Sequence, residues 1–449
     1  MNKTVVIDIV GLSSSVIGQH TPFLQKYIAQ KQLRTIEPLL PAVTTAVQST
    51  YLTGKFPSDT GIVGNGWYDH ADSEVKFWKQ SNKLVQGEKI WDKAKKEDPS
   101  FTCANMFWWY NMYSSADYSV TPRPNYLADG RKLPDCYSHP AELRDHLQNK
   151  LGQFPLFQFW GPGANIKSTQ WIADAAMENE ELHNPTLTLI YLPHLDYCLQ
   201  KFGPDLAKID KELQEIDGVV EQLVTFYQNK GARIILLSEY GIAPVDNPIH
   251  LNRILREHGL LQIRTECGLE LLDAGASKAF AVADHQIAHI YINDKTVIEK
   301  VKALLEGIPG VELVLDKTEQ TKHHINHERS GDLVLMAAEK SWFTYYFWVD
   351  DAKAPDYARV VDIHKKPGYD PVEMFMTSKL RAGYKLLRKK AGLRYVMDVI
   401  PLDATLIKGS HGRIGIPDAY KPIIITDNSN DIKNINATDV FDIIWQHLH

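Results

Sequence analysis

Cysteine is scarce in this sequence: four residues in a chain of 449, and none of them forms a CxxC pair. They stand far apart, at Cys103, Cys136, Cys198 and Cys267. This spacing is typical of neither a disulfide-stapled domain nor a zinc finger. An excess of positive charge is also missing, because the formal net charge is −6. Proteins that coat nucleic acid usually carry a general basic field, so we expect no such partner.

Long apolar runs are missing as well. The first fifteen residues, MNKTVVIDIVGLSSS, contain one short apolar run, which Asp8 interrupts before Gly11. This run is too short for the core of a signal peptide, and no later run reaches the length that spans a bilayer. We therefore expect a cytoplasmic protein without a membrane partner. Nothing in the residues indicates an oligomeric state.

The residues that are present predict an α/β fold. Four short, β-branched apolar runs are typical of buried parallel strands, and they lie at residues 5–10, 187–192, 233–237 and 422–426. Residues 205–227 repeat apolar side chains every three or four positions, from Leu206 to Leu223, which predicts a helix packed on the sheet. Strands that alternate with such helices indicate a doubly wound, mostly parallel sheet.

Two regions interrupt this alternation. Residues 66–165 are rich in aromatic side chains and proline, and we interpret them as an excursion over the core. Residues 276–340 read as strand, strand, helix, strand and strand, which predicts a small α+β lid. We therefore predict a core made of residues 1–275 and 341–449, with the lid inserted between them.

Acidic residues follow or end three of the predicted strands, at Asp8, Asp196 and Glu239. Ligands bind at the carboxyl ends of strands in an open parallel sheet, so these carboxylates are expected to converge. Together with His194 and His411 they resemble a ligand set for Zn²⁺ or Mn²⁺. Taken singly, each acid is more typical of a helix cap or a surface turn than of a metal ligand. Their repetition at strand ends reverses this preference.

A second element lies in residues 41–70. Thr44 and Thr45 precede the short helical pattern AVQSTYLTG, so they stand at the N-terminus of a helix, where anions bind. A hydroxyl at such a place, bound to a metal, can ionise and attack phosphorus. The alternative is an ordinary threonine N-cap.

The same thirty residues resemble the nucleophile region of the type I phosphodiesterase and nucleotide pyrophosphatase branch of the alkaline phosphatase superfamily, and of its phosphonoacetate hydrolase relatives. Thr44 precedes the helix, Thr53-Gly54 closes it, and TGIVGN brings Asn65 twenty-one residues beyond Thr44. The resemblance implies an alkaline-phosphatase-like fold, Thr44 as nucleophile, and Asn65 with the Thr44 N–H as a cradle for a phosphoryl oxygen. It also implies two Zn²⁺ ions, with Mn²⁺ as the alternative.

Further family positions match in part. Asp8, Asp196 and His411 correspond to metal ligands of the family. The family also places a His where this chain has Gln200, and an Asp-His pair where it has Glu239-Tyr240. Two imidazoles are therefore replaced, and a single ion is an alternative to two.

Four other polar residues have two alternative roles. Asp284, His285, Asp362 and His364 could supply missing ligands, or could be hydrogen-bonded supports or loop staples. The histidines at 323, 324 and 327 we interpret as a solvated turn of the lid.

Two aromatic segments could line a substrate pocket: Trp67-Tyr68 and residues 107–113. We favour a place for both in the hydrophobic core. Lys365 and Lys366 could meet an anionic group of a substrate, although a solvated pair is favoured.

We therefore expect a metal-dependent hydrolase of a small phosphate ester, with a phosphodiesterase favoured. A phosphonate or phosphomonoester hydrolase is the runner-up. A degenerate protein that binds a phosphorylated metabolite without turnover is the third alternative.

Overall fold

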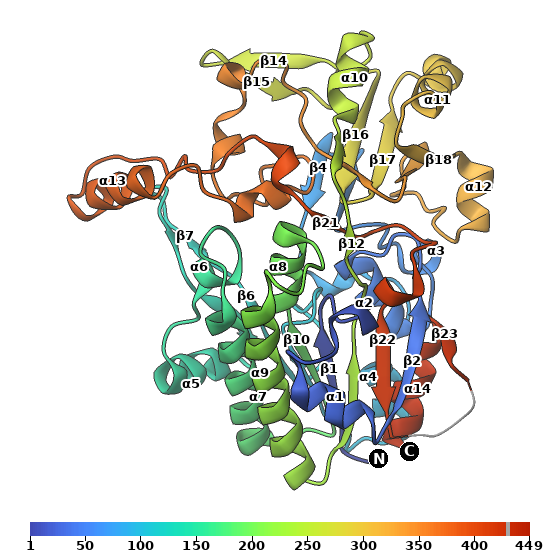
Figure 1. The fold of residues 1–449 in the computed structure, drawn as a ribbon, viewed down its shortest axis with the longest axis vertical. Helices are drawn as coiled ribbons and strands as arrows, with labels where there is room; N and C mark the ends of the chain where they lie inside the picture. The colour runs from blue at the N-terminus through green and yellow to red at the C-terminus, as the bar shows by residue number, and fades with distance from the viewer. Residues whose placement is uncertain (428–431) are drawn as a thin grey trace.

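A computed structural model describes residues 1–427 and 432–449 of the chain. Its larger part is built on a nine-stranded mixed sheet (Figure 1). In sheet order the strands are β23 (Asn434–Asn436), β2 (Gln32–Glu37), β22 (Ile423–Thr426), β11 (Arg233–Leu237), β1 (Thr4–Ile9), β10 (Leu187–Leu192), β5 (Cys103–Met106), β6 (Tyr118–Pro122) and β9 (Cys136–His139). The α/β class expected from the sequence is confirmed.

The centre of this sheet is parallel and buried. Strands β1, β10, β11, β5 and β6 run in one direction, and every residue of β1 and β10 is buried. Continuous apolar runs form such strands because helices cover both faces. Strand β22 is antiparallel to both of its neighbours, so its predicted parallel direction was wrong. A strand that is apolar on both faces carries no periodic signal of its direction.

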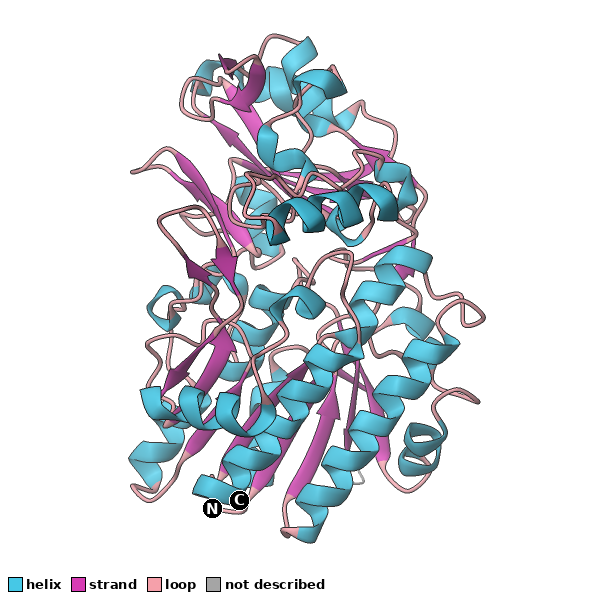
Figure 2. Cartoon of the chain, turned by 90° about the vertical axis from the view of Figure 1, so that its left-hand side faces the viewer, coloured by secondary structure: helices cyan, strands magenta, loops and turns pink. Residues whose placement is uncertain are grey.

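Helices cover both faces of the sheet, and Figure 2 shows the longest of them running alongside the strands. Helices α7 and α9 contact β10 and β11, whereas α14 contacts β1 and α2. Their bounds are α1 (Pro22–Ile28), α2 (Thr44–Thr53), α3 (Pro57–Thr60), α4 (Ile90–Glu97), α5 (Ala141–Leu151), α6 (Leu156–Phe159), α7 (Ile166–His183), α8 (His194–Phe202), α9 (Asp210–Asn229) and α14 (Asp439–Leu448). Helix α9 begins later than predicted, and Leu206 lies before it as an exposed residue.

A smaller part of the molecule holds a four-stranded antiparallel sheet. Its strands are β16 (Ala279–Asp284), β17 (Ile287–Ile292), β19 (Leu333–Ala337) and β18 (Val311–Leu315), with α10 (Leu251–Glu257), α11 (Ile298–Glu306), α12 (Lys317–Lys322) and the hairpin β14 (Ile263–Glu266) to β15 (Leu269–Leu272) nearby. The strands occur in the predicted order along the chain, and α12 is additional. The division of the chain into core and lid insertion stays a prediction.

Short strand pairs lie between and beside the two sheets. They are β12 (Ala243–Pro244) with β21 (Gly409–Ser410), β13 (Asn247–Ile249) with β20 (Ser341–Phe343), β3 (Gly66–Asp69) with β4 (Glu74–Phe77), and β7 (Asn125–Tyr126) with β8 (Lys132–Leu133). Helix α13 (Lys379–Lys390) projects sideways from the body (Figure 1). Within residues 1–427 and 432–449, none of the helices has the length and apolarity to cross a membrane.

Candidate active site

Three carboxylates meet at the carboxyl edge of the parallel strands. Asp8 lies one residue before the end of β1, Glu239 follows β11, and Asp196 lies in the first turn of α8, directly after β10. All three side chains are buried, and the charges of Asp8 and Asp196 both interact with Glu239. The predicted convergence of the three acids is therefore observed.

Thr44 is the first residue of α2. The residue before it, Val43, occupies the N-cap position and has an apolar side chain, while Gly54 closes the helix with a left-handed backbone. Thr44 therefore does not cap the helix, and its Oγ1 lies 3.1 Å from the phenol oxygen of Tyr240. The interpretation of Thr44 as an ordinary N-cap is wrong.

Gln48 lies one helical turn after Thr44 and connects two of the acids. Its side-chain nitrogen donates to the carboxylate of Glu239 and lies 3.5 Å from Oδ2 of Asp8. Its side-chain oxygen accepts from the backbone N–H of Trp109 at 2.6 Å. Sequence reasoning missed Gln48, although residues four apart share a helix face and this spacing could have found it.

Burial dominates the protonation of the acids. It raises the pKa of Glu239 to about 7, and it raises the pKa of Asp8 well above its ordinary value, with the charge of Glu239 as the next cause. Two buried carboxyls side by side cannot both ionise without a proton or a cation between them. Asp8 and Glu239 therefore need either a shared proton or a bound cation.

Asp196 is held by two neutral donors. The Gln200 amide donates to its Oδ2 at 2.8 Å, and the Tyr240 hydroxyl donates to its Oδ1 at 3.2 Å. Burial raises the pKa of Asp196 to about 7. The Gln200 carbonyl in turn accepts from the Tyr369 hydroxyl at 3.0 Å, which fixes the Gln200 amide in place.

His411 completes this side of the site. Its Nδ1 donates to the backbone oxygen of Ala42 at 2.8 Å, and its Nε2 lies 3.9 Å from Asp196 Oδ1. The imidazole stacks on the Tyr240 ring with 3.5 Å between centroids. Burial and the neighbouring His285 lower the pKa of His411, so the ring is neutral near pH 7.

The fit of these residues to a metal centre is partial. Nowhere in the described part of the chain are three or more His, Cys, Asp or Glu side chains grouped to hold an ion. The two-ion arrangement does not fit, because Gln200 and Tyr240 stand in place of imidazoles. Among the described residues, Asp8 Oδ1, Glu239 Oε2 and His411 Nε2 are buried without a hydrogen-bond partner. The two free carboxylate oxygens suit a single hard cation at Asp8 and Glu239.

Asn65 lies beside the helix start as expected, but its contacts differ from the expectation. Its Oδ1 accepts from the Thr45 N–H at 3.1 Å, and its own N–H and side-chain amide donate to Asp284 at 2.8 and 3.1 Å. His285 lies 2.8 Å from Asp284, and its ring packs between Tyr369 and His411. Asp284 and His285 therefore have the contacts of hydrogen-bonded supports rather than of metal ligands.

Several predicted ligands lie elsewhere. His194 is two residues before Asp196 on α8, so it points to another face, and its Nε2 lies 3.3 Å from Glu215 on α9. Asp362 lies near Lys365 at 3.7 Å, and His364 Nδ1 lies 3.3 Å from the backbone oxygen of Phe77. None of these contacts brings His194, Asp362 or His364 to Asp8 and Glu239, and their role as metal ligands stays a prediction.

Two further assignments change. Lys366 is buried and pairs with Asp370 and Glu373 at 2.7 Å each, so the predicted solvated pair holds only for the exposed Lys365. Trp67 is buried beneath the guanidinium of Arg329, as the favoured core interpretation expected, and not in a substrate wall.

The histidines at 323, 324 and 327 lie at the end of α12 and after it, and the first of the three caps the helix. The ring of His324 stacks on Phe56 with 4.1 Å between centroids, so the turn is only partly solvated. His324 itself is exposed and His323 and His327 are half-buried, so the predicted solvated turn agrees with the structure apart from this stacking.

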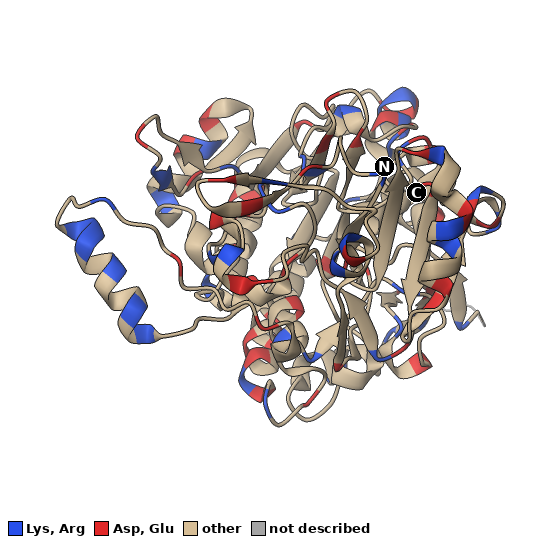
Figure 3. Ribbon diagram, turned by 90° about the horizontal axis from the view of Figure 1, so that it is seen from above, with Lys and Arg blue, Asp and Glu red and all other residues tan. Residues whose placement is uncertain are grey.

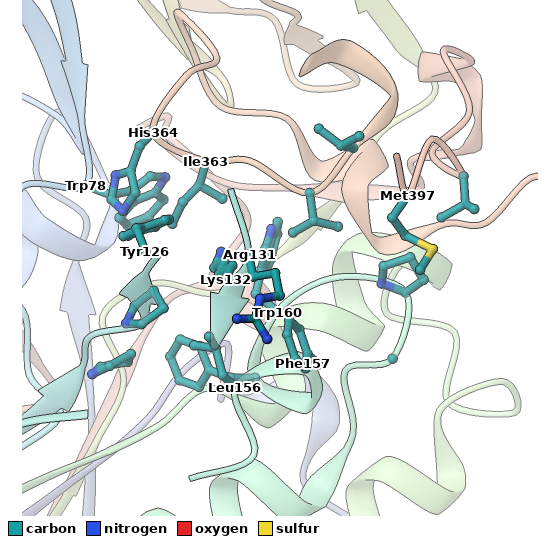
Figure 4. A pocket seen from close by; sticks show the side chains of 18 of the residues that line it. Trp78, Tyr126, Arg131, Lys132, Leu156, Phe157, Trp160, Ile363, His364 and Met397 are labelled. Carbon is teal, nitrogen blue, oxygen red and sulfur yellow. The ribbon is translucent and has the colours of Figure 1, made fainter. Parts of the chain in front are cut away.

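A cleft of about 1220 Å³ opens over Thr44, Asp196, Tyr240 and His285. Its walls are rich in aromatic side chains, which include Trp78, Trp109, Trp160, Tyr197 and Tyr369. Figure 4 shows the outer part, where Leu156, Phe157 and Trp160 face Ile363, His364 and Met397. The aromatic run at 107–113 is divided, since Phe107 and Trp108 are core residues whereas Trp109 lines the cleft.

Comparison with known proteins adds a family match. A family profile described as type I phosphodiesterase / nucleotide pyrophosphatase matches residues 4–370. An uncharacterized pyrophosphatase/phosphodiesterase of Schizosaccharomyces pombe is 26% identical over 47% of the chain, and ectonucleotide pyrophosphatase/phosphodiesterase 2 of Saccharomyces cerevisiae is 22% identical over 54%. The matched parts are 38% and 48% of those two proteins, so the chain spans less than half of their length.

Solved structures share the fold. Phosphonoacetate hydrolase of Sinorhizobium meliloti in complex with phosphonoformate has a TM-score of 0.63 and 14% identity, with 100% of this chain and 96% of that chain covered. Murine ectonucleotide pyrophosphatase/phosphodiesterase 5, as an inactive variant in complex with AMP, has a TM-score of 0.60 and 13% identity, with 100% and 95% covered. These likenesses confirm the expected alkaline-phosphatase-like fold.

Proposed function

Because the chain belongs to the type I phosphodiesterase / nucleotide pyrophosphatase family, a family of phosphoric ester hydrolases, we propose that it hydrolyses a phosphodiester with Thr44 as nucleophile. One observation carries the proposal: the Thr44 hydroxyl stands at the first residue of α2, lines the large cleft and contacts Tyr240. The start of α2 favours an anionic group in front of this hydroxyl, through the helix dipole and exposed N–H groups.

Tyr240 gives Thr44 a route for its proton. When the Tyr240 hydroxyl donates to Asp196, its oxygen is left to accept from Thr44 Oγ1. As Thr44 attacks phosphorus, the bond from phosphorus to the leaving oxygen breaks, the leaving oxygen takes a proton from water, and a phospho-threonine forms that water then hydrolyses. In the attack the Thr44 proton passes to the Tyr240 oxygen while the Tyr240 proton passes to Asp196 Oδ1. A base with a pKa of about 7, as Asp196 has, is suited to this role at neutral pH. The His of the family at position 240 is thus replaced by a group that relays a proton.

Metal dependence is the second part of the proposal, with one divalent cation rather than two. The buried oxygens of Asp8 and Glu239 that lack partners within the described structure would hold it, close to Thr44. A hard ion such as Mn²⁺ suits a set of oxygen ligands better than Zn²⁺ does, and this chain offers fewer imidazole ligands than the family pattern. When bound, the ion lowers the pKa of an oxygen ligand and offsets charge on the phosphoryl group.

The substrate class follows from the cleft. Its aromatic side chains can stack on, or make apolar contact with, the organic groups that are esterified to the phosphate. A phosphonate or phosphomonoester stays the second enzyme candidate. A protein that only binds a phosphorylated metabolite is favoured by one observation, the lack of a three-ligand group in the described residues.

The test is the release of p-nitrophenol from bis-p-nitrophenyl phosphate, with Mn²⁺, Zn²⁺ or EDTA, for the wild type and Thr44→Ala. Thr45→Ala is the matched control, because Thr45 Oγ1 donates to the Gly64 backbone oxygen instead of facing Tyr240. We expect activity in the wild type and in the control, and a loss of at least about a thousandfold in Thr44→Ala. Equal rates in all three proteins would contradict the role of Thr44. Phosphate or phosphonate binding by calorimetry, without turnover of any ester, would support the binding protein.

The place in the cell is proposed from the sequence alone. We propose a cytoplasmic protein, and fractionation of native cells with antibody detection tests this location. Recovery from a secreted or periplasmic fraction would overturn it.

A further inference from the structure

Helix α13 carries a strong local charge on an otherwise acidic protein. Residues 379–397 contain seven Lys or Arg and no Asp or Glu, whereas the whole chain has a net charge of −6. Figure 3 shows the helix standing away from the body with Lys and Arg along its length. A basic amphipathic helix in this setting is typical of a surface that binds an anionic partner.

The helix has two apolar faces with different surroundings. Ala382 and Leu386 line the cleft, and Ala382 is buried. On another face Leu380, Tyr384 and Leu387 follow at steps of four and three, and their exposed fractions are 88%, 55% and 67%. One turn of the helix takes 3.6 residues, so these three form a stripe that points away from the cleft. Leu393 and Val396, at 55% and 52%, extend the exposed apolar surface beyond the helix.

Basic side chains flank the stripe. Arg381 and Lys385 pair with Asp398, which fixes the base of the segment. In the part of the chain that the structure describes, Lys379, Lys390 and Arg394 are in no ion pair with a carboxylate. Their charges are therefore available to a partner on the outer side.

We propose that residues 376–397 bind the surface of an anionic phospholipid membrane. Leu380, Tyr384 and Leu387 would enter the boundary between headgroups and acyl chains, while the lysines and arginines meet the lipid phosphates. A second copy of the chain is disfavoured as the partner, because a symmetric contact would bring the two positive segments together. Surface binding requires no spanning helix, and it revises the expectation of no membrane partner. The inference does not rest on the proposed hydrolysis.

Leu386, Lys389 and Leu393 line the cleft, so the segment that carries the stripe also forms part of the cleft wall. Because the stripe points away from the cleft, docking through the stripe leaves the cleft lining on the opposite side of the helix.

Cosedimentation of the full chain with vesicles tests the proposal. Phosphatidylcholine vesicles, with and without phosphatidylglycerol, are compared at low and high NaCl. We expect binding that needs phosphatidylglycerol and weakens at high salt. Leu380→Ser/Leu387→Ser and, separately, Lys379→Glu/Lys390→Glu should each weaken partition by roughly tenfold or more.

Matched controls change the same residue types elsewhere on the surface. Leu182→Ser/Leu206→Ser alters two leucines that are 43% and 39% exposed, and Lys300→Glu/Lys322→Glu alters two exposed lysines. Both controls should bind vesicles like the wild type. Equal binding of all variants, or none by the wild type, would overturn the proposal. A dimer in light scattering that Leu380→Ser/Leu387→Ser dissociates would assign the stripe to a second copy instead.

Discussion

The phenol oxygen of Tyr240 lies 3.1 Å from Oγ1 of Thr44. The same oxygen lies 3.2 Å from Asp196 Oδ1, so one hydroxyl joins the proposed nucleophile to a carboxylate. The Tyr240 ring also stacks on His411, which fixes its position independently of these hydrogen bonds. The hydroxyl and the ring can therefore be separated by mutation.

Tyr240→Phe should lower kcat by roughly a hundredfold, because it removes the proton route from Thr44 but keeps the stacked ring. KM should change little, since the substrate is not expected to bind through this hydroxyl. Tyr227→Phe is the control, because the Tyr227 hydroxyl is buried and donates to the backbone oxygen of Ala176, away from Thr44 and Asp196. Steady-state kinetics on bis-p-nitrophenyl phosphate measure both variants. A kcat for Tyr240→Phe within twofold of the control would exclude the relay.

Gln48→Glu tests whether one cation belongs at Asp8 and Glu239. The change places a third carboxyl beside two buried ones, so the free energy of unfolding should fall by about 3 kcal/mol in EDTA. Mn²⁺ should restore the loss, because the new carboxylate adds a hard ligand. Thermal unfolding with and without Mn²⁺ measures the effect.

Gln320→Glu is the matched control for Gln48→Glu. Gln320 is the buried residue of α12 and donates to the backbone oxygens of Leu315, Gly331 and Asp332. Its replacement should also destabilise, but without any response to Mn²⁺. The idea of a cation at Asp8 and Glu239 fails if the two variants respond alike.

Asp196 should make stability depend on pH. Its folded pKa of about 7 lies above its ordinary value of 3.8 because the carboxyl is buried. The folded state therefore keeps a proton that the unfolded chain loses, and stability falls as pH rises from about 4 to about 7, by about 4 kcal/mol in total. Above pH 7 this contribution is constant. Urea unfolding in EDTA at several pH values should show the fall in the wild type and a flatter profile in Asp196→Asn; parallel profiles would refute the assignment.

Part of the site could be predicted because local signals were strong. Strands β10 and β11 have the predicted bounds, since each is a short apolar run that helices cover on both sides. Thr44 and Gly54 mark the ends of α2, because a helix start and a left-handed glycine depend on few neighbours. The convergence of Asp8, Asp196 and Glu239 followed from the rule for strand ends.

The remaining parts depend on long-range packing. Tyr369 reaches Gln200 from 169 positions away, and no periodic pattern connects them. His364 sits in a polar loop like that of His411, yet only the second loop returns to the carboxyl edge through β21. The burial of Lys366 depends on Asp370 and Glu373 facing it, which a pair of adjacent lysines does not reveal.

Lys366 and Lys365 offer a direct comparison of a buried and an exposed lysine. Lys366 is almost fully buried between two carboxylates, so Lys366→Met leaves Asp370 and Glu373 without their cation. The free energy of unfolding should fall by about 3–5 kcal/mol, because the remaining charges repel in a dry environment. Lys365→Met, at an exposed neighbour, should stay within about 0.5 kcal/mol of the wild type. Urea unfolding at pH 7 measures both variants. The double variant Lys366→Met/Asp370→Leu should recover part of the lost stability, because it removes one uncompensated charge together with the lysine. Equal stabilities of the two single variants would mean that the buried ion pairs contribute nothing to the fold.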